Sequence, residues 1–291
     1  MLIQLRGRVP NIAHRAGKHV SESEVALLLT GDSEVYKPNG EPLLILRRGA
    51  ISEETCEVAY EALHAIRKYK TANRGKYAGS KRTRRRFKDG SLSRSAEAET
   101  IASAAVGYID RQGGRFPFCR ETSFVGKEPE QWATVMPMVE RVADVFKATL
   151  PARYAKQLAL ARSAPKQFVI GKTPFTTLTV NNNVAGAIHQ DKGDYKDGFG
   201  CISVVRRGTY SGCWLVFPEY AVAADLQDGD LLFFNSHDWH ANTPFRDTVE
   251  GYERISVVYY FRSRMTECGT PAQEIDRARK RYGSLEGIPV E

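Results

Sequence analysis

The spacing of hydrophobic and polar residues changes near residue 167, which divides the chain into two halves. In the first half, apolar positions recur at helical intervals and predict helices, and one apolar run at 42–48 predicts a strand. The helices are expected over residues 52–70, 96–108, 130–150 and 151–162. In the second half, short β-rich runs alternate with turns and predict seven strands, over residues 168–170, 175–181, 185–190, 201–207, 213–218, 231–235 and 255–262.

This order of elements predicts an α+β fold. A double-stranded β-helix, also called a jelly roll or cupin fold, is expected in the C-terminal half, with helices from the N-terminal half packed against it. Ser52 is placed to cap the first helix, and Pro137 to kink or start the third. A single domain is expected over 42–265, and a surface helix over 271–282. The predicted divisions are an N-terminal arm or set of strands at 1–41 and a helical support at 42–165. The jelly-roll core follows at 166–265 and a C-terminal tail at 266–291.

The composition excludes several classes of protein. With 291 residues, 42% of them hydrophobic, the chain can bury a sizeable core and is too apolar to be disordered. No run approaches the roughly 20 apolar residues of a membrane span, and the N-terminus lacks the apolar segment of a secretory signal. The five cysteines are odd in number and form no C-x-x-C pair, so neither a disulfide framework nor a cysteine-rich zinc module is expected. We expect a cytoplasmic protein, monomeric and without a membrane partner.

The net charge of +8 is concentrated in one segment of the chain. Residues 67–94 contain twelve basic residues and one acidic residue, a balance of +11, so the rest of the chain carries −3. The part over 71–95 is also rich in Gly, Ser and Thr and is predicted to be a long loop. Such a segment favours a polyanionic partner, nucleic acid above all, although a solvated loop without a partner would have the same composition.

Three residues in the β-rich half indicate a metal site. Residues i and i+2 of a strand point to the same face, so His189 and Asp191 can direct an imidazole and a carboxylate to one point. His240 follows about fifty residues later, after the apolar run 231–234. Two histidines and one carboxylate leave one face of a metal open, as in the facial triad of non-haem Fe(II) oxygenases. His237 competes with His240 for this role, and we prefer His240 because the Ala-Asn step after it resembles the segment after the distal histidine in this enzyme class.

Arg254 opens the last β-rich run and must meet an anion if it is buried, because an unpaired buried cation is costly. Its fork-shaped guanidinium suits a carboxylate. One interpretation is that Arg254 binds the far carboxylate of 2-oxoglutarate and that Ser256 adds a hydroxyl group. The alternative is a structural ion pair with Glu250 or Glu253.

The motif H-x-D at 189–191, followed by His240 and by R-x-S at 254–256, resembles the motif of the Fe(II)/2-oxoglutarate dioxygenase superfamily. The sequence around these residues is similar to the sequences of the TET/J-binding-protein branch, and to those of its phage and bacterial members in particular. The resemblance extends over about residues 81–264, and the segments that carry it are 107–110, 118–122, 180–183, 187–194 and 211–218. It implies the cytoplasm of a bacterium or of a phage-infected host.

The resemblance implies that the triad binds Fe(II), that 2-oxoglutarate and dioxygen are cosubstrates, and that the enzyme hydroxylates the 5-methyl group of a pyrimidine flipped out of methylated duplex DNA. 5-Methylcytosine is the first expectation, with possible further oxidation, and thymine is the alternative. Asn181 or Asn183 would lie near the cosubstrate or the base. The cations expected to contact DNA phosphates are Lys81, Arg82, Arg84, Arg85, Arg86, Arg120 and Lys192.

Two rival functions fit parts of the sequence. The same iron motif serves hydroxylases of proteins and small molecules, although the basic segment argues against those substrates. A non-catalytic, cupin-like DNA-binding module is the second rival, and the intact set of candidate site residues argues against it. The aromatic residues that could stack on bases are equally plausible as core residues: Phe87, Phe116, Phe199 and Trp239.

Overall fold

The structure is a computed structural model that describes residues 1–9, 11–69, 77–79, 83–97, 100–113 and 116–283. Its centre is a nine-stranded sheet with the strand order β1-β3-β4-β14-β10-β17-β9-β7-β8. In that order the strands are Leu2–Gln4, Ser33–Tyr36, Pro42–Arg47, Leu231–Phe234, Gly200–Arg207, Glu253–Tyr260, Thr177–Asn182, Ser103–Ile109 and Arg120–Glu121. None of the helices in these ranges is both long enough and apolar enough to cross a membrane.

A four-stranded sheet in the order β15-β12-β13-β2 packs against part of the large sheet. Its strands are Ala241–Asn242, Leu215–Phe217, Val222–Ala224 and Leu27–Leu29. Two further pairs are β11 with β16 and β5 with β6, at Ser211–Gly212, Phe245–Arg246, Thr83–Arg86 and Leu92–Glu97. The N-terminal segment therefore supplies strands to both sheets, since β1 and β3 join the large one and β2 the small one.

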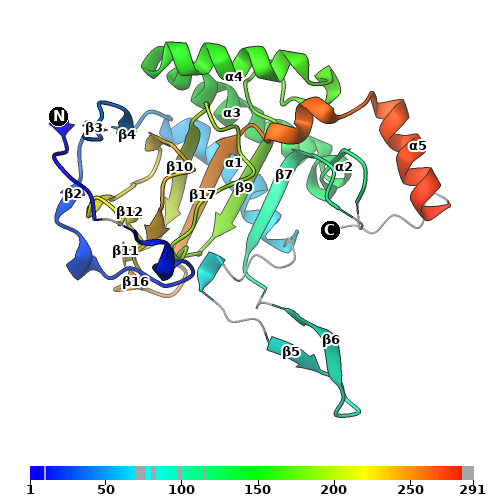
Figure 1. Ribbon diagram of the computed structural model, residues 1–291, viewed down its shortest axis with the longest axis horizontal. Helices are drawn as coiled ribbons and strands as arrows, with labels where there is room; N and C mark the ends of the chain where they lie inside the picture. The colour runs from blue at the N-terminus through cyan, green and yellow to red at the C-terminus, as the bar shows by residue number, and fades with distance from the viewer. Residues whose placement is uncertain (10, 70–76, 80–82, 98–99, 114–115, 284–291) are drawn as a thin grey trace.

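Helices α1 to α4 cover the other face of the large sheet, whereas α5 lies beyond its end (Figure 1). The α-helices α1 to α5 are Glu53–Ala65, Ser123–Lys127, Pro129–Thr149, Pro151–Ser163 and Pro271–Tyr282. The short 3-10 helices are Ala13–Arg15, Glu22–Glu24, Ile66–Lys68, Lys166–Phe168 and Ser263–Glu267. The expected helices at 52–70, 130–150, 151–162 and 271–282 are confirmed within a few residues, and so is the Ser52 cap, whose hydroxyl accepts from the Thr55 amide at 3.3 Å. The long helix α3 begins at Pro129 and contains Pro137, so Pro137 does not start it.

The alternation of side chains along β14 explains why the sheet has two apolar faces. Leu231 and Phe233 join the cluster formed with α1 and α3, whereas Leu232 and Phe234 join the cluster formed with the small sheet. All four side chains are buried, and each such burial stabilises the fold by about 1.5–3 kcal/mol. The sandwich and its helical layer thus follow from a strand that is apolar on both faces.

Several predicted elements are wrong. The helix expected at 96–108 is instead strand β7, which lies inside the large sheet between β9 and β8. Both faces of β7 are covered, so its small buried residues do not alternate between apolar and polar. The two-residue period by which a strand is recognised in a sequence is therefore absent. The strand expected at 168–170 is the end of a 3-10 helix and the residues after it, and the one at 185–190 is a loop with a single bridge at His189. The predicted loop at 71–95 contains strand β5 and the start of strand β6.

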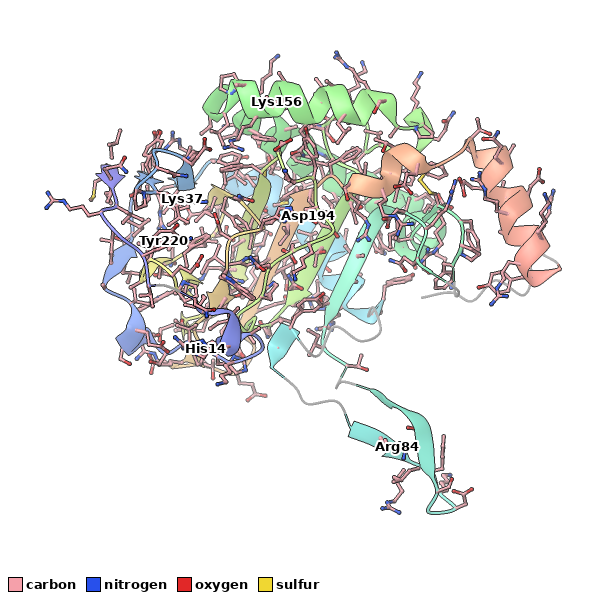
Figure 2. The ribbon with its side chains drawn as sticks, viewed as in Figure 1. His14, Lys37, Arg84, Lys156, Asp194 and Tyr220 are labelled. Carbon is pink, nitrogen blue, oxygen red and sulfur yellow. A yellow bond between two sulfur atoms is a disulfide. The ribbon has the colours of Figure 1, made fainter. Side chains whose placement is uncertain are left out.

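The β5–β6 hairpin extends away from the sandwich (Figure 1). Figure 2 shows Arg84 on this hairpin, far from Asp194, which lies within the body of the protein. The described basic residues of the hairpin are thus presented outside the packed layers rather than on their surface.

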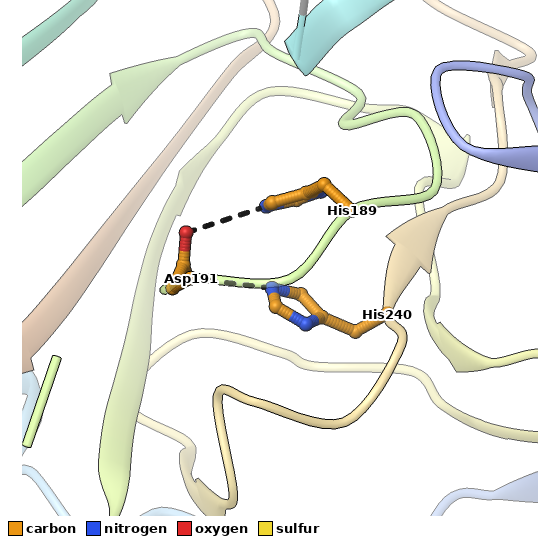
Figure 3. A group of neighbouring side chains, drawn as sticks. All are labelled: His189, Asp191 and His240. Atoms are coloured by element: carbon orange, nitrogen blue, oxygen red, sulfur yellow. Dashed lines mark ion pairs between the residues drawn. The ribbon is translucent and has the colours of Figure 1, made fainter. Parts of the chain in front are cut away.

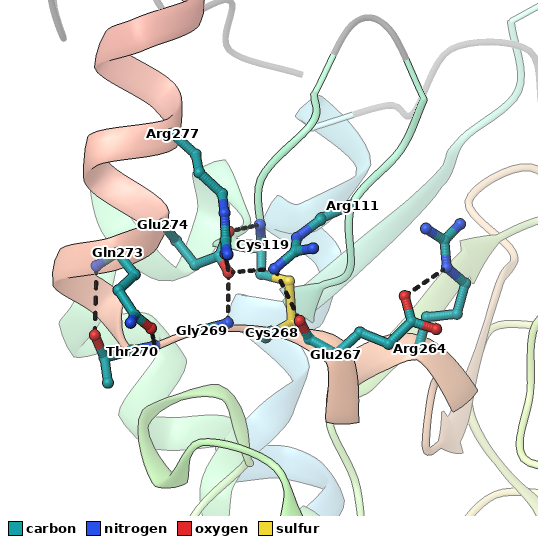
Figure 4. Close-up of polar contacts among 10 residues, drawn as sticks. All are labelled: Arg111, Cys119, Arg264, Glu267, Cys268, Gly269, Thr270, Gln273, Glu274 and Arg277. Carbon is teal, nitrogen blue, oxygen red and sulfur yellow. Dashed lines mark hydrogen bonds and ion pairs between the residues drawn. A yellow bond between two sulfur atoms is a disulfide. The ribbon is translucent and has the colours of Figure 1, made fainter.

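Although the number and spacing of the cysteines predict no disulfide framework, the structure contains one disulfide bond. Cys119, just before β8, is bonded to Cys268, just before α5, across a sequence separation of 149 residues. The buried carboxylate of Glu274 reinforces this junction by accepting from the amides of Cys119 at 2.9 Å and Gly269 at 2.5 Å (Figure 4). Helix α5 is therefore fastened to the end of the large sheet by one covalent bond and a network of charge-assisted hydrogen bonds.

Candidate metal centre and adjoining cavity

His189, Asp191 and His240 converge at one point of the structure (Figure 3). Their candidate ligand atoms all lie within 4.8 Å of one another. Nε2 of His189 is 3.8 Å from Oδ1 of Asp191, and Nε2 of His240 is 3.5 Å from Oδ2 of the same carboxylate. His237 is not part of this group, and its Nε2 instead contacts the Asp194 carbonyl oxygen at 3.2 Å.

Backbone pairing brings the three residues together although the loop that carries two of them is not a strand. The amide of His189 donates to the carbonyl of His240 at 3.0 Å, and the reverse bond is 3.1 Å. The Asp191 amide donates to the Ser236 carbonyl at 2.9 Å. The Gly186 amide donates to Oδ1 of Asn242 at 3.2 Å, which holds the start of this loop beside the residue that follows Ala241. The predicted common direction of His189 and Asp191 thus arises from these pairings.

The hydrogen bonds of the two imidazoles direct their Nε2 atoms toward the centre of the group. Nδ1 of His189 contacts the Ala187 carbonyl at 2.7 Å, and Nδ1 of His240 contacts the Asp238 carbonyl at 2.9 Å. A carbonyl oxygen can only accept, so Nδ1 carries the proton and Nε2 keeps the lone pair in both neutral rings. This arrangement is typical of histidines that bind metals, and a set of two imidazoles and one carboxylate fits Fe(II).

The environment of His240 favours positive charge at the site. Burial alone lowers the pKa of this imidazole, but the Asp191 carboxylate and the carbonyl and carboxylate of Asp238 outweigh burial and raise it. A cation held between the two histidines and Asp191 would satisfy the same negative potential.

A cavity of about 260 Å³ adjoins the three residues. Apolar side chains from both sheets form part of its wall: Ile202, Leu215, Phe234 and Val258. Polar side chains form most of the remainder: Ser103, Thr179, Asn181, Asn242, Ser256 and Tyr260. A cavity of this size beside a metal site, with polar side chains that can orient a bound molecule, is suited to a small polar ligand.

Arg254 lies at one end of the strand that forms a wall of this cavity. It shares its face of β17 with Ser256, Val258 and Tyr260, which line the cavity, although Arg254 itself is not in the lining. The side chain is 2% exposed, and its Nη2 has no hydrogen-bond partner in the structure. A buried guanidinium nitrogen without a partner is costly, so it fits the carboxylate of a bound molecule.

The alternative partner for Arg254 is occupied elsewhere. The Glu253 carboxylate accepts from Tyr60 at 2.6 Å, contacts His64 Nδ1 at 2.7 Å and accepts from Asn182. Burial raises the pKa of Glu253, but these three hydrogen bonds outweigh it and the pKa is lowered. Neither Glu253 nor Glu250 forms an ion pair with Arg254, and no other described carboxylate does so.

The structure separates the two candidate asparagines. Asn181 lines the cavity, accepts from the Ser103 hydroxyl at 2.6 Å and donates to Ser256 at 3.4 Å. Asn183 is exposed and holds the backbone at Arg254. Its side-chain Oδ1 accepts from the backbone amide of Arg254 at 2.7 Å, and its backbone amide donates to the carbonyl of Arg254 at 2.9 Å. Asn181 is therefore in a position to contact a bound molecule, whereas Asn183 supports Arg254.

Comparison with known proteins identifies the family. Residues 103–263 match the Tet/JBP family, described as the oxygenase domain of the 2OGFeDO superfamily. This chain is a member of the Tet/JBP oxygenase family. The expected membership of the TET/J-binding-protein branch is thus confirmed.

Curated relatives of this Tet/JBP oxygenase include two kinetoplastid proteins. It is 34% identical to thymine dioxygenase JBP1 of Trypanosoma brucei brucei over 168 residues, which is 57% of this chain and 20% of that protein. It is 31% identical to thymine dioxygenase JBP1 of Leishmania braziliensis over 195 residues, which is 66% of this chain and 24% of that protein. The chain therefore spans only about a fifth to a quarter of the length of these relatives.

A solved structure supports the fold of the Tet/JBP oxygenase. NgTET1 in complex with 5mC DNA matches with a TM-score of 0.60 and 12% sequence identity, over 87% of this chain and 86% of that one. At this identity the match speaks for the fold alone. The expected double-stranded β-helix with packed helices is confirmed.

The cations expected to bind DNA lie in three different settings in this Tet/JBP oxygenase. Arg84 and Arg86 are exposed on the β5–β6 hairpin, where Arg85 also lies, while Lys81 and Arg82 fall outside the described residues. Lys192 lines the cavity beside Asp191. Arg120 lies over the Phe116 ring, 3.8 Å from its centroid, and donates to Gln112 at 3.3 Å, so it does not face the cavity.

The candidate stacking aromatics are mostly core residues. Phe116 and Phe199 are 1% and 3% exposed, and Trp239 packs against a buried cluster that includes Ile188. Phe87 is 47% exposed at the end of the hairpin. Phe87 is therefore the only one of the four that the structure presents to a partner.

Sequence reasoning missed two parts of the cavity wall. Tyr77, from the basic segment, lies edge-on to His189 at 5.2 Å between ring centroids, and its carbonyl accepts from the Ala187 amide at 2.5 Å. Arg262 lines the cavity and donates to Asp110 at 2.7 Å. In the sequence, the Gly-Tyr-Ile-Asp segment that ends at Asp110 is marked only by its resemblance to the family. Nothing in the sequence around Tyr77 predicts that it lies next to His189.

Proposed function

We propose that this chain is an Fe(II)- and 2-oxoglutarate-dependent dioxygenase that hydroxylates the 5-methyl group of a pyrimidine in DNA. The observation that carries the proposal is the convergence of His189, Asp191 and His240 beside a cavity, one wall strand of which carries the buried Arg254, whose Nη2 has no hydrogen-bond partner among the described residues. Membership of the Tet/JBP oxygenase family supports the same conclusion.

Each site residue has a role that follows from its contacts. The Nε2 atoms of His189 and His240 and the Asp191 carboxylate hold Fe(II), and the carbonyls behind both rings fix their orientation. Arg254 pairs with the far carboxylate of 2-oxoglutarate, with Ser256 beside it. Fe(II) with its cosubstrate supplies, when bound, the oxidation of a methyl C–H bond by dioxygen.

DNA is the substrate best supported by the relatives and by the charge distribution. JBP1 is named a thymine dioxygenase, and the NgTET1 structure contains 5mC DNA. A methyl group within a duplex cannot reach an enclosed metal, so the base must flip out, which costs a few kcal/mol. Phosphate contacts from Lys192 at the cavity and from the basic segment offset this cost.

Two bases remain candidates for the flipped nucleotide. The resemblance in sequence makes 5-methylcytosine the first expectation and thymine the alternative. The curated relatives are thymine dioxygenases by name, which supports keeping thymine as a candidate. The bases share the 5-methyl group and differ in their Watson–Crick edges, so one assay with both duplexes decides between them.

The test is oxidation of defined duplexes by the protein reconstituted with Fe(II) under anaerobic conditions and then supplied with 2-oxoglutarate and air. Nucleoside mass spectrometry should detect a hydroxymethyl product from 5-methylcytosine or thymine. Asp191→Ala should abolish the product, while Asp197→Ala, which removes an exposed carboxylate from the same loop, should not. Turnover of 2-oxoglutarate with a protein or a small molecule, but with neither duplex, would overturn the proposal.

A further inference from the structure

The β5–β6 hairpin has an ordered tip rather than an irregular loop. The Phe87 amide donates to the Ser91 carbonyl at 2.8 Å, and the Gly90 amide donates to the Phe87 carbonyl at 3.0 Å. Asp89 accepts from both the amide and the hydroxyl of Ser91, at 2.9 and 2.6 Å. Gly90 has a φ of +84°, a conformation that a glycine adopts without strain. The hairpin is thus a built element that projects from the fold.

Both flanks of the hairpin lie in the wall of the candidate active-site cavity. Tyr77 precedes the hairpin and contacts His189, while Ile101 and Ser103 follow it and line the same cavity. The hairpin is therefore attached to the body beside the cavity that would receive the reactive group of a substrate.

The surface of the hairpin suits a nucleic acid. Residues 83–97 include five basic and two acidic residues. Arg84 and Arg86 are exposed, and Arg86 donates to the Gly90 carbonyl at 2.7 Å, which holds its stem against the tip. Phe87 and Leu92, at 47% and 45% exposure, add apolar surface between the cations. Cations suit phosphates, and apolar side chains suit base edges and methyl groups.

We propose that the β5–β6 hairpin lies as a two-stranded ribbon in the major groove of duplex DNA, on one side of the flipped nucleotide. The inference rests on the proposed function, in which a base of that DNA enters the cavity. The major groove, about 12 Å wide, admits a two-stranded β-ribbon. Leu92 is the cross-strand partner of Arg86 and shares its face of the ribbon. This face meets the groove, with the long side chains of Arg84 and Arg86 reaching phosphates, Leu92 facing the base edges and Phe87 lying at the tip.

The length of the ribbon sets the length of DNA that it covers. The shorter strand, β5, has four residues, which at about 3.4 Å per residue span about 14 Å of paired ribbon. The axial rise of DNA is about 3.4 Å per base pair, so the ribbon covers roughly four base pairs. The protein should therefore need about four base pairs of duplex on one side of the modified base and fewer on the other.

The experiment uses duplexes with one 5-methylpyrimidine, in which either flank is shortened from ten base pairs to two while the other is held at ten. Binding is measured by fluorescence anisotropy with the full chain. Affinity should fall sharply when one particular flank becomes shorter than about four base pairs and change little when the other is shortened. The variant Arg84→Ala/Arg86→Ala should lose this asymmetry, and its salt slope should fall by about two because two phosphate contacts are removed.

A matched control removes two exposed cations elsewhere. Arg279→Ala/Lys280→Ala, in the last turn of α5, should keep the wild-type asymmetry and salt slope. The variant Phe87→Ala/Leu92→Ala tests the apolar tip and should weaken binding of long duplexes without changing the salt slope. Thermal melting confirms that each variant is folded.

The outcomes distinguish this inference from the proposed function. Equal loss of affinity from both flanks, or an asymmetry that survives in Arg84→Ala/Arg86→Ala, would refute the ribbon even if the DNA is oxidised. Single-stranded DNA bound as tightly as the duplex would also refute it. Conversely, a one-sided requirement for duplex with no oxidation of either base would support the ribbon and contradict the proposed function.

Discussion

Asn183 offers a graded test of how the fold holds Arg254. The residue has a φ of 51°, in the left-handed region, and its side chain accepts from the Arg254 amide at 2.7 Å. Asn183→Gly removes the hydrogen bond but keeps the conformation, and should lower the free energy of unfolding by about 1 kcal/mol. Asn183→Ala removes the same hydrogen bond but keeps a Cβ in the left-handed region, which alanine tolerates less well than asparagine, so it should be about 1–2 kcal/mol less stable than the glycine variant. Asn183→Asp keeps an acceptor and should remain close to wild type.

The assay has two readouts for the same variants. Urea unfolding measures stability, and calorimetric titration with 2-oxoglutarate, with Mn(II) in place of Fe(II), measures how well Arg254 is positioned. The Kd for 2-oxoglutarate should rise in the order Asp, Gly, Ala at position 183. A control, Asn39→Ala, removes an asparagine side chain that accepts from the Glu41 amide in a distant turn and should leave this Kd unchanged.

Two results would refute this reasoning. If the Asn183→Gly and Asn183→Ala variants are equally stable, backbone conformation at position 183 contributes nothing. If both are destabilised but bind 2-oxoglutarate like the wild type, Asn183 supports the strand end without positioning Arg254.

Three further predictions concern the clamp, the disulfide and the buried carboxylate. Arg254→Lys should weaken 2-oxoglutarate binding by about 10-fold or more in the same titration, because an ammonium group cannot form two parallel hydrogen bonds to a carboxylate; unchanged affinity would remove Arg254 from the cosubstrate site. Cys119→Ser should lower the free energy of urea unfolding by about 2–4 kcal/mol, since the bond to Cys268 closes a long loop, and equal stability would contradict this. Glu253 has a lowered pKa in the folded protein, so its contribution to stability is present above the pKa of an unfolded glutamate and lost as the pH falls; Glu253→Gln should remove part of the acid-induced loss of stability, and an unchanged pH profile would argue against it.

The features that could be predicted from the sequence are those whose signal is local. The apolar runs at 201–207, 231–235 and 255–262 are strands because their residues face two packed layers, and they correspond to β10, β14 and β17. The metal-site candidates His189 and Asp191 stand two residues apart, and the structure brings them together with His240.

The features that were missed depend on long-range contacts or on one unusual backbone conformation. Cys119 and Cys268 meet across 149 residues, and no spacing in the sequence marks them as a pair. Asn181 and Asn183 would share a face if the strand continued, but β9 ends at Asn182 and the positive φ of Asn183 turns its side chain toward the backbone of Arg254. Tyr77 reaches His189 from a segment whose composition indicates only charge.

The stoichiometry of the reaction tests the central claim most directly. The Fe(II)-loaded protein is incubated with 2-oxoglutarate, dioxygen and methylated duplex DNA, and succinate and hydroxymethylated nucleoside are quantified in the same sample. The account predicts one succinate for each hydroxymethyl group formed, with both products absent in Asp191→Ala. Hydroxymethyl product without succinate, or equal yields of both products in wild type and Asp191→Ala, would contradict the assignment of His189, Asp191 and His240 as the iron site.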